Sequence, residues 1–204
     1  MVNQQVPQFT LIFATHNHHK VQEIQTFLKP YPIHIQQQAW KTYEVQSDNL
    51  QEIACLSVID AVKKSQSPTF VEDTGFYIDD LRGFPGPYAS YVHKTIGNSG
   101  ILKLMLNKLN RKAYFRSVIA YCTPDTPPIC FEGTIQGTIA LNERGPKGFG
   151  FDPIFFPSTC DKTFGEMPVS EKNPISHRGR ALKKFINWLL ESSLYIEEND
   201  GIAT

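Results

Sequence analysis

The first run of apolar and β-branched residues in the chain is too short for a helix. Residues 9–15 (FTLIFAT) therefore read as a buried first strand. From Val21 the apolar positions take a helical spacing, and the prolines that follow end this helix. The alternation over 33–37 predicts a second strand, and the apolar content of 49–64 predicts a second helix.

The second half of the chain contains longer strands. Segments 114–121 and 129–141 are strand-like, and the proline-rich turn between them predicts a hairpin. From Ser176 onward, apolar residues recur with the period of a helix that packs on the core. The other expected elements are short strands at 69–71 and 154–156, a tight loop at 82–88 and a helix at 101–109.

Length and composition indicate one globular domain. The chain has 204 residues, 41% of them hydrophobic and 20% charged. No repeat, low-complexity stretch or linker divides it, so we expect a single domain over 1–204 with poorly ordered tails at 1–8 and 192–204. The expected fold class is α/β, with a mixed central sheet flanked by helices.

The charge balance argues against a nucleic-acid binder. Lys plus Arg and Asp plus Glu number 20 each, and no basic stripe is visible. A negative ligand must therefore be held by a few placed charges. The N-terminus does not resemble a signal peptide, and no apolar run approaches the roughly 20 residues that span a bilayer. We expect a cytoplasmic protein that binds neither nucleic acid nor membrane.

The cysteines show no metal-binding pattern. Cys55, Cys122, Cys130 and Cys160 are far apart, with no C-x-x-C pair. This spacing favours reduced, mostly buried thiols.

The turn after the first strand is a candidate for phosphate binding. It reads HNHHK (16–20) between a buried strand and a helix. Such a turn presents backbone N–H groups and the positive end of the helix dipole. Thr15 and Asn17 add donors, and Lys20 adds a positive charge, which together suit a triphosphate. Both glycine-rich phosphate fingerprints are absent, so a capped helix with a solvated lysine is the alternative.

Two consecutive acids at the end of the short third strand form the strongest candidate. Glu72 and Asp73 point to opposite sides of a strand, so they do not form a simple surface patch. Carboxylate oxygens at a strand end suit magnesium, which keeps several waters and takes up phosphate oxygens. Glu44 is a candidate further ligand, with an exposed loop acid as the alternative, while Asp79 and Asp80 better fit a solvated loop.

Two later segments are candidates for holding a flat base. In GFGFDP, glycines permit close approach, and Phe149 or Phe151 offers a ring for stacking, although both also suit the core. In EKNPISHRGR, Lys172, His177 and Arg178 lie around a helix start, where positive charge opposes the helix dipole. Ligand binding explains their placement better than helix stability does.

Four blocks in this order resemble the inosine/xanthosine triphosphate pyrophosphatases, enzymes that remove non-standard purine nucleotides. The resemblance covers about 13–188, in the blocks ATHNHHK, VEDTGFYIDDLRGFPGPY, GFGFDPIF and SEKNPISHRGRAL. It implies magnesium-dependent hydrolysis of ITP, dITP and XTP to the monophosphate and pyrophosphate. It also implies an elongated mixed α/β fold of two lobes with a long active-site cleft, usually in a homodimer.

The resemblance also implies roles for individual residues. Asp73 would be the catalytic base, and Glu44 and Asp73 would hold magnesium, with Glu72 as a third candidate ligand. The phosphates would be bound by Thr15, His16, Asn17, His18, His19 and Lys20. Substrate contacts on the base side would come from Thr74, Phe149, Gly150, Phe151, Asp152, Lys172, His177 and Arg178.

This sequence departs from the family pattern at two positions. Ser57 stands where relatives carry a lysine on the second helix, with Lys63 and Lys64 one to two turns further along. His16 stands where a turn glycine is expected, a milder change because histidine also adopts turn conformations.

Selectivity for the base would come from hydrogen-bond matching. A site that donates to a purine 6-oxo group leaves that donor unpaired against the 6-amino group of adenine. His177 and Arg178 are the candidate donors. The alternatives to this function are a non-catalytic nucleotide sensor and a pyrophosphatase for modified pyrimidine or guanine nucleotides.

Overall fold

The computed structural model describes residues 9–40, 45–146 and 148–200, and its centre is a mixed β-sheet. The strands are β1 (Phe9–Ala14), β2 (Ile33–Gln38), β3 (Thr69–Ile78), β4 (Pro85–Gly86), β5 (Lys112–Cys122), β6 (Ile129–Ile139) and β7 (Phe155–Pro157). They lie in the order β2-β1-β3-β5-β6-β7, with β4 paired to β3. Strand β1 is parallel to β2 and β3, whereas β3, β5, β6 and β7 pair antiparallel. The predicted α/β class with a mixed sheet is confirmed.

The helices connect these strands or pack on them. They are α1 (His18–Leu28), α2 (Leu50–Ser65), α3 (Ala89–Thr95), α4 (Gly97–Leu104), α5 (Val169–Lys172) and α6 (His177–Asp200), together with the 3₁₀ turns η1 (Asp79–Leu81), η2 (Asp152–Ile154) and η3 (Phe164–Glu166). None of the helices in the described ranges is long and apolar enough to cross a membrane.

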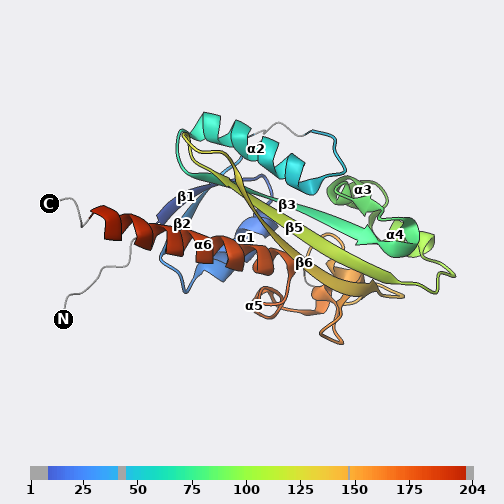
Figure 1. The fold of residues 1–204 in the computed structure, drawn as a ribbon. Helices are drawn as coiled ribbons and strands as arrows, with labels where there is room; N and C mark the ends of the chain where they lie inside the picture. The colour runs from blue at the N-terminus through green and yellow to red at the C-terminus, as the bar shows by residue number, and fades with distance from the viewer. Residues whose placement is uncertain (1–8, 41–44, 147, 201–204) are drawn as a thin grey trace.

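Helices α1 and α6 cover one face of the sheet, and α2 covers the other (Figure 1). On the first face the rings of Phe13 and Phe70 stack with centroids 4.6 Å apart, and Phe185 of α6 lies 5.5 Å from Phe70. On the second face Val58 of α2 and Val118 of β5 belong to one buried cluster. Both helical layers thus bury the apolar stripes that their sequences predict.

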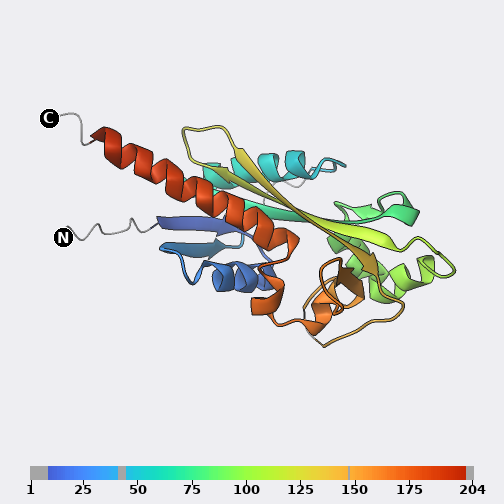
Figure 2. The same cartoon turned by 60° about the horizontal axis from the view of Figure 1, so that its bottom comes forward.

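The long strands continue beyond these helices into a second core. Phe76, Phe115 and Phe155 form it with buried residues of α3 and α4. Figures 1 and 2 show the resulting elongated shape, with α3, α4 and the segment before α6 gathered at the far end of the sheet. Strands β3 and β5 therefore contribute buried residues both to the core under the helices and to the second core.

Several boundaries differ from the sequence predictions. Strand β3 does not end at residue 71 but runs to Ile78, because its polar residues find buried partners and Gly75 leaves room for the Tyr77 ring, which a Cβ there would meet at 2.5 Å. Helix α3 was not predicted, since its tyrosine, valine and threonine favour strands. The helix expected over 101–109 begins earlier and ends at Leu104. The last helix continues past residue 192.

Candidate active site

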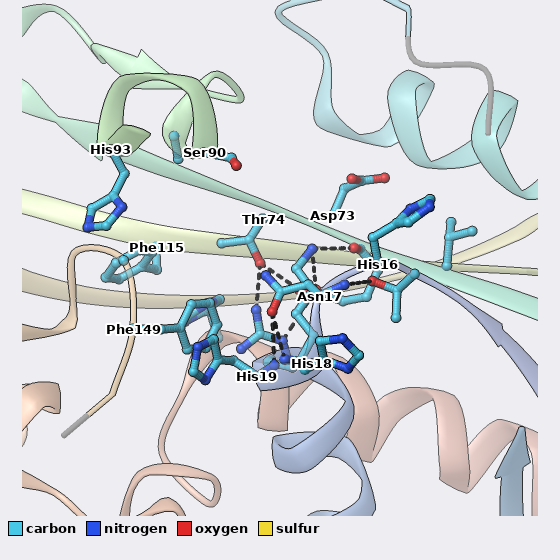
Figure 3. A pocket seen from close by; sticks show the side chains of 18 of the residues that line it. His16, Asn17, His18, His19, Asp73, Thr74, Ser90, His93, Phe115 and Phe149 are labelled. Atoms are coloured by element: carbon cyan, nitrogen blue, oxygen red, sulfur yellow. Dashed lines mark hydrogen bonds and ion pairs between the residues drawn. The ribbon is translucent and has the colours of Figure 1, made fainter. Parts of the chain in front are cut away.

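A cavity of about 670 Å³ lies where the β1–α1 turn, β3, α3 and the two base-side segments meet (Figure 3). Of the predicted site residues, Glu44 falls outside the described residues, and all the others line this cavity. They are Thr15, His16, Asn17, His18, His19, Lys20, Glu72, Asp73, Thr74, Phe149, Gly150, Phe151, Asp152, Lys172, His177 and Arg178. The fold brings together four blocks that are far apart in the sequence.

The β1–α1 turn is built as a capped helix start. The side chain of Asn17 accepts hydrogen bonds from the amides of His19 and Lys20 at 3.0 and 3.2 Å. The Asn17 amide donates to the hydroxyl of Thr15. Most of the amides that the sequence offered to phosphate are therefore used within the turn. Within the described part of the chain, no hydrogen bond occupies the amides of His16 and His18.

The two consecutive acids of β3 face opposite sides of the sheet, as strand geometry predicts. Figure 3 shows Asp73 pointing away from the side on which Thr74 lies. The Glu72 carboxylate is buried on the Thr74 side, where its Oε1 accepts hydrogen bonds from the hydroxyls of Thr74 and Ser117 at 2.6 and 2.5 Å. Only Asp73 of the pair presents a half-buried carboxylate to the cavity.

Two cations hold the other oxygen of Glu72. Its Oε2 lies 2.8 Å from Lys20 Nζ and 3.3 Å from Arg178 Nε, in ion pairs rather than well-aligned hydrogen bonds. Lys20 Nζ also donates to the Glu72 carbonyl oxygen at 2.6 Å. Lys20 is thus anchored rather than mobile. Both oxygens of Glu72 are thus engaged, and its carboxylate positions these two cations, while its role as a third metal ligand stays a prediction.

A buried acid on α1 holds Lys172 and Arg178, the cations at the end of the cavity where the nucleobase is expected. Glu23 accepts a hydrogen bond from Lys172 Nζ at 2.7 Å through Oε1, and from Arg178 through Oε2. Lys172 also donates to Asp152 Oδ2 at 2.6 Å, and Arg178 donates to Thr74 Oγ1 at 3.1 Å. Sequence reasoning missed Glu23. The available signal was an acid on the apolar side of α1, one turn after Lys20 and next to Ile24.

Burial and pairing shift the acidities in this network. Burial alone would raise the pKa of Glu23, but the charges of Arg178 and Lys172 lower it. Burial also opposes ionisation of Glu72, yet Arg178 in particular holds the Glu72 pKa below its usual range. Burial raises the pKa of Asp152, and Lys172 offsets this only in part. The ion-paired side chains of this network comprise three acids and three bases. The acids are Glu23, Glu72 and Asp152, and the bases are Lys20, Lys172 and Arg178.

His177 is a buried neutral imidazole. Burial lowers its pKa well below the usual value, and the charges of Arg178 and Lys172 lower it further. Its ring stacks on Phe115 with centroids 4.7 Å apart. Its Nδ1 has no hydrogen-bond partner among the described residues, and the ring lines the cavity. A buried polar atom without a partner is costly in the empty protein and is well placed for a ligand.

The two candidate stacking rings have different environments. Phe151 is 3% exposed and stacks on Phe76 at 4.9 Å, so it belongs mainly to the core. Phe149 is half-buried, with the Lys172 ammonium 5.0 Å from its ring centroid. The His19 ring also stacks on it. Phe149 is therefore the better platform for a base.

A family model for the Ham1 family matches residues 11–188 of this chain. The chain belongs to the Ham1 family. It is 46% identical over 182 residues to a dITP/XTP pyrophosphatase of Thermococcus kodakarensis, covering 89% of this chain and 98% of the relative. It is 47% identical over 178 residues to a dITP/XTP pyrophosphatase of Methanopyrus kandleri, covering 87% and 95%.

Solved Ham1 structures share the fold. A Ham1 protein from Coxiella burnetii matches with a TM-score of 0.80 and 30% identity, covering 90% of this chain and 100% of that one. The Ham1 protein of Staphylococcus aureus matches with a TM-score of 0.78 and 27% identity, covering 90% and 99%. The resemblance inferred from the four sequence blocks is confirmed.

Further residues of this Ham1 protein line the cavity. Ser57 is buried on α2 and faces the cavity, and Trp40 also lies on its wall. From α3 come Ser90, His93 and Lys94. Helix α3 carried no sequence signal for a helix, so its cavity face could not be recognised. Lys63 and Lys64 do not line the cavity, and Lys64 pairs with Asp60 at 2.6 Å.

Proposed function

We propose that this Ham1 protein hydrolyses non-standard purine nucleoside triphosphates, namely dITP, ITP and XTP, to the monophosphate and pyrophosphate. Relatives that are 46–47% identical over most of the chain are dITP/XTP pyrophosphatases. The observation that carries the proposal is the cavity itself. One end holds buried donors beside the half-buried ring of Phe149, and the other holds a carboxylate beside a helix start.

Base selection is assigned to the buried end of the cavity. His177 keeps a buried Nδ1 without a hydrogen-bond partner among the described residues, and Arg178, whose Nε lies 3.3 Å from Glu72 Oε2, lines the cavity beside it. A donor on His177 or Arg178 would be satisfied by a purine 6-oxo group, whereas the 6-amino group of adenine would leave it unpaired. Asp152 and Lys172 would complete this end, with Phe149 stacking on the base.

Magnesium is the proposed cofactor, and the residues present fit it. Magnesium is commonly held by one or two carboxylates together with waters and phosphate oxygens. Asp73 offers such a carboxylate, although the described ranges contain no group of three or more ligating side chains. Glu44, the proposed second ligand, lies outside those ranges. When bound, the ion would neutralise phosphate charge and polarise phosphorus.

The charge balance of the cavity supports a need for a metal ion. Lys20, Lys172 and Arg178 are already paired with buried carboxylates, so they contribute little net charge toward a triphosphate. The amides of His16 and His18 and the side chain of Lys94 add some attraction. A metal ion is the simplest source of the remaining positive charge that a triphosphate needs.

For the chemical step, Asp73 is the proposed base. Its carboxylate would accept a proton from the water that attacks the α-phosphorus, and pyrophosphate would leave. The 15–20 turn would orient the phosphates, with Lys20 held in place by Glu72. Thr74 would contact the substrate from the position that its bond to Arg178 fixes.

A homodimer acting in the cytoplasm, where the nucleotide pool is, completes the proposal. Large apolar side chains are exposed around α3 and α4, including Tyr91 at 70%, Leu106 at 71% and Leu109 at 99%. Such a patch is typical of a protein–protein contact. Analytical ultracentrifugation should give twice the chain mass for the wild type and the chain mass for a Leu106→Glu, Leu109→Glu variant. A monomeric wild type would contradict the proposed dimer but would not bear on the proposed activity.

The activity is tested by product analysis. Phosphate and pyrophosphate should be measured separately over ITP, dITP, XTP, GTP, ATP and dUTP with magnesium. We expect pyrophosphate and monophosphate, with kcat/KM for ITP and XTP at least tenfold above that for ATP. Release of inorganic phosphate would indicate attack at the γ-phosphorus, and a preference for dUTP or GTP would reassign the substrate.

A further inference from the structure

Two cysteines that are 75 positions apart in the sequence lie side by side in the structure. Cys55 on α2 and Cys130 on β6 have their sulfur atoms 2.8 Å apart, across the contact between the helix and the sheet. Both side chains are half-buried, so solvent reaches the pair. Neither residue lines the active-site cavity.

The other two thiols are placed differently. Cys122 is buried, and its thiol donates to the carbonyl oxygens of Thr123 and Thr126 at 3.2 and 3.1 Å. Cys160 packs against the second core, the one that contains Phe76, Phe115 and Phe155. The geometry therefore selects one pair out of four cysteines.

Bond formation between Cys55 and Cys130 needs little movement. A disulfide joins its sulfurs at about 2.05 Å, so these two must approach by about 0.8 Å. Rotation of the two side chains supplies such a change. The backbone on each side is fixed, since α2 packs on the sheet through Val58 and Ala61.

We propose that Cys55 and Cys130 form an oxidation site, at which a small-molecule disulfide converts the two thiols into a disulfide bond that fastens α2 to β6. The Cys55 thiolate attacks the oxidant, and one thiolate leaves. The Cys130 thiol gives its proton to solvent, and its sulfur attacks Cys55, releasing the second thiolate. The protein loses two protons and two electrons, and the oxidant is reduced to two thiols.

The order of attack follows from the surroundings of the two sulfurs. Burial raises the pKa of Cys130 to about 12, and the neighbouring Cys55 sulfur contributes to this rise. Cys130 is therefore the weaker initial nucleophile, and Cys55 reacts first. Once Cys55 is in a mixed disulfide it carries no negative charge, so the part of the rise due to that charge is removed.

The disulfide bond is expected to stabilise the fold and to leave the catalytic activity nearly unchanged. It closes a loop that contains the whole of β3, which lowers the entropy of the unfolded chain. No cysteine lines the cavity among the described residues, so oxidation alters none of its groups. Oxidised protein should melt several degrees higher and keep its turnover within about twofold.

The experiment uses glutathione disulfide on the full chain, followed by digestion without reductant and mass spectrometry. The free thiol count should fall from four to two, with a linked peptide pair containing Cys55 and Cys130. Dithiothreitol should reverse both the link and the rise in melting temperature. Cys55→Ser and Cys130→Ala should each abolish the linked peptide pair and the rise in melting temperature. Cys160→Ser is the matched control, which should keep the link and the rise.

Other results would overturn the proposal. Four unreacted thiols, a stable glutathione adduct on Cys55, or a link that includes Cys122 would each show that this pair does not close. A Cys55–Cys130 link without a higher melting temperature would refute the stabilising role. None of these readouts depends on which nucleotide the enzyme hydrolyses.

Discussion

The imidazole ring of His19 stacks on the ring of Phe149, with centroids 5.0 Å apart and planes at 9°. The two residues come from segments 130 positions apart, the first turn of α1 and the loop before η2. At this spacing no base fits between the rings. His19 therefore occupies a face of the ring to which we assign base stacking, whereas the sequence had placed it among the phosphate ligands.

Removing His19 should improve substrate binding. A stacked aromatic pair is worth about 0.5–1.5 kcal/mol, which a base must displace in order to use that face of Phe149. His19→Ala should lower KM for ITP by about two- to tenfold at unchanged kcat. His18→Ala, an exposed neighbour on the same turn, is the control for charge near the phosphates. A higher KM in His19→Ala would instead show that His19 itself binds the nucleotide.

Asp73→Asn should remove nearly all turnover. The change keeps the shape of the side chain but removes its basicity, and loss of a general base costs about a hundredfold or more. The melting temperature should change little, because Asp73 is only half-buried. Asp79→Asn, an exposed acid on η1, is the control and should behave as wild type. Activity within a few-fold of wild type in Asp73→Asn would exclude it as the base.

Much of this site could be predicted because strand alternation and helix starts are local properties. The separation of Glu72 from Asp73 follows from the strand period alone. The roles of Glu23 and Lys20 could not be predicted, since their partners lie on other elements and only the fold brings them within 3 Å. The Cys55–Cys130 contact was missed for the same reason.

Chelation should abolish turnover, and magnesium should restore it. The paired cations of the cavity leave the charge of a triphosphate largely uncompensated, so the metal has to supply the rest. Calcium should support less turnover, because its looser coordination positions water poorly. The measurement is pyrophosphate release after treatment with a chelator and addition of each metal. Full activity in the presence of chelator would reject the metal requirement.

Stability should fall as the pH drops below about 6.5, and His177 is one cause. Its folded pKa lies well below the usual 6.5, so between these values the unfolded chain binds a proton that the folded chain does not. The stability lost therefore grows as the pH falls through this window. His177→Asn, which does not titrate, should flatten the slope of melting temperature against pH between about 5 and 6.5. His34→Asn, which replaces an exposed histidine on β2, is the matched control variant.

Ser57→Lys should strengthen binding of the triphosphate. Ser57 is 4% exposed and lines the cavity from α2, so a lysine there must extend into the cavity toward the proposed phosphate site. A charge-assisted hydrogen bond is worth about 1.5–3 kcal/mol where it is well formed, which corresponds to a KM lower by about tenfold or more. Lys63→Ser removes an exposed cation from the same helix and should have no effect.

The outcome of Ser57→Lys also tests which native cation takes the place of the family lysine. Lys94 of α3 is the candidate, because it lines the cavity whereas Lys63 and Lys64 do not. If Lys94 already contacts the phosphates, Lys94→Ala alone should raise KM, and Ser57→Lys should restore it in the double variant. If Ser57→Lys lowers activity in the wild-type background but rescues Lys94→Ala, the two cations compete for one phosphate group. No kinetic change in either single variant would mean that neither residue faces the phosphates and that α2 lines a part of the cavity that the substrate leaves empty.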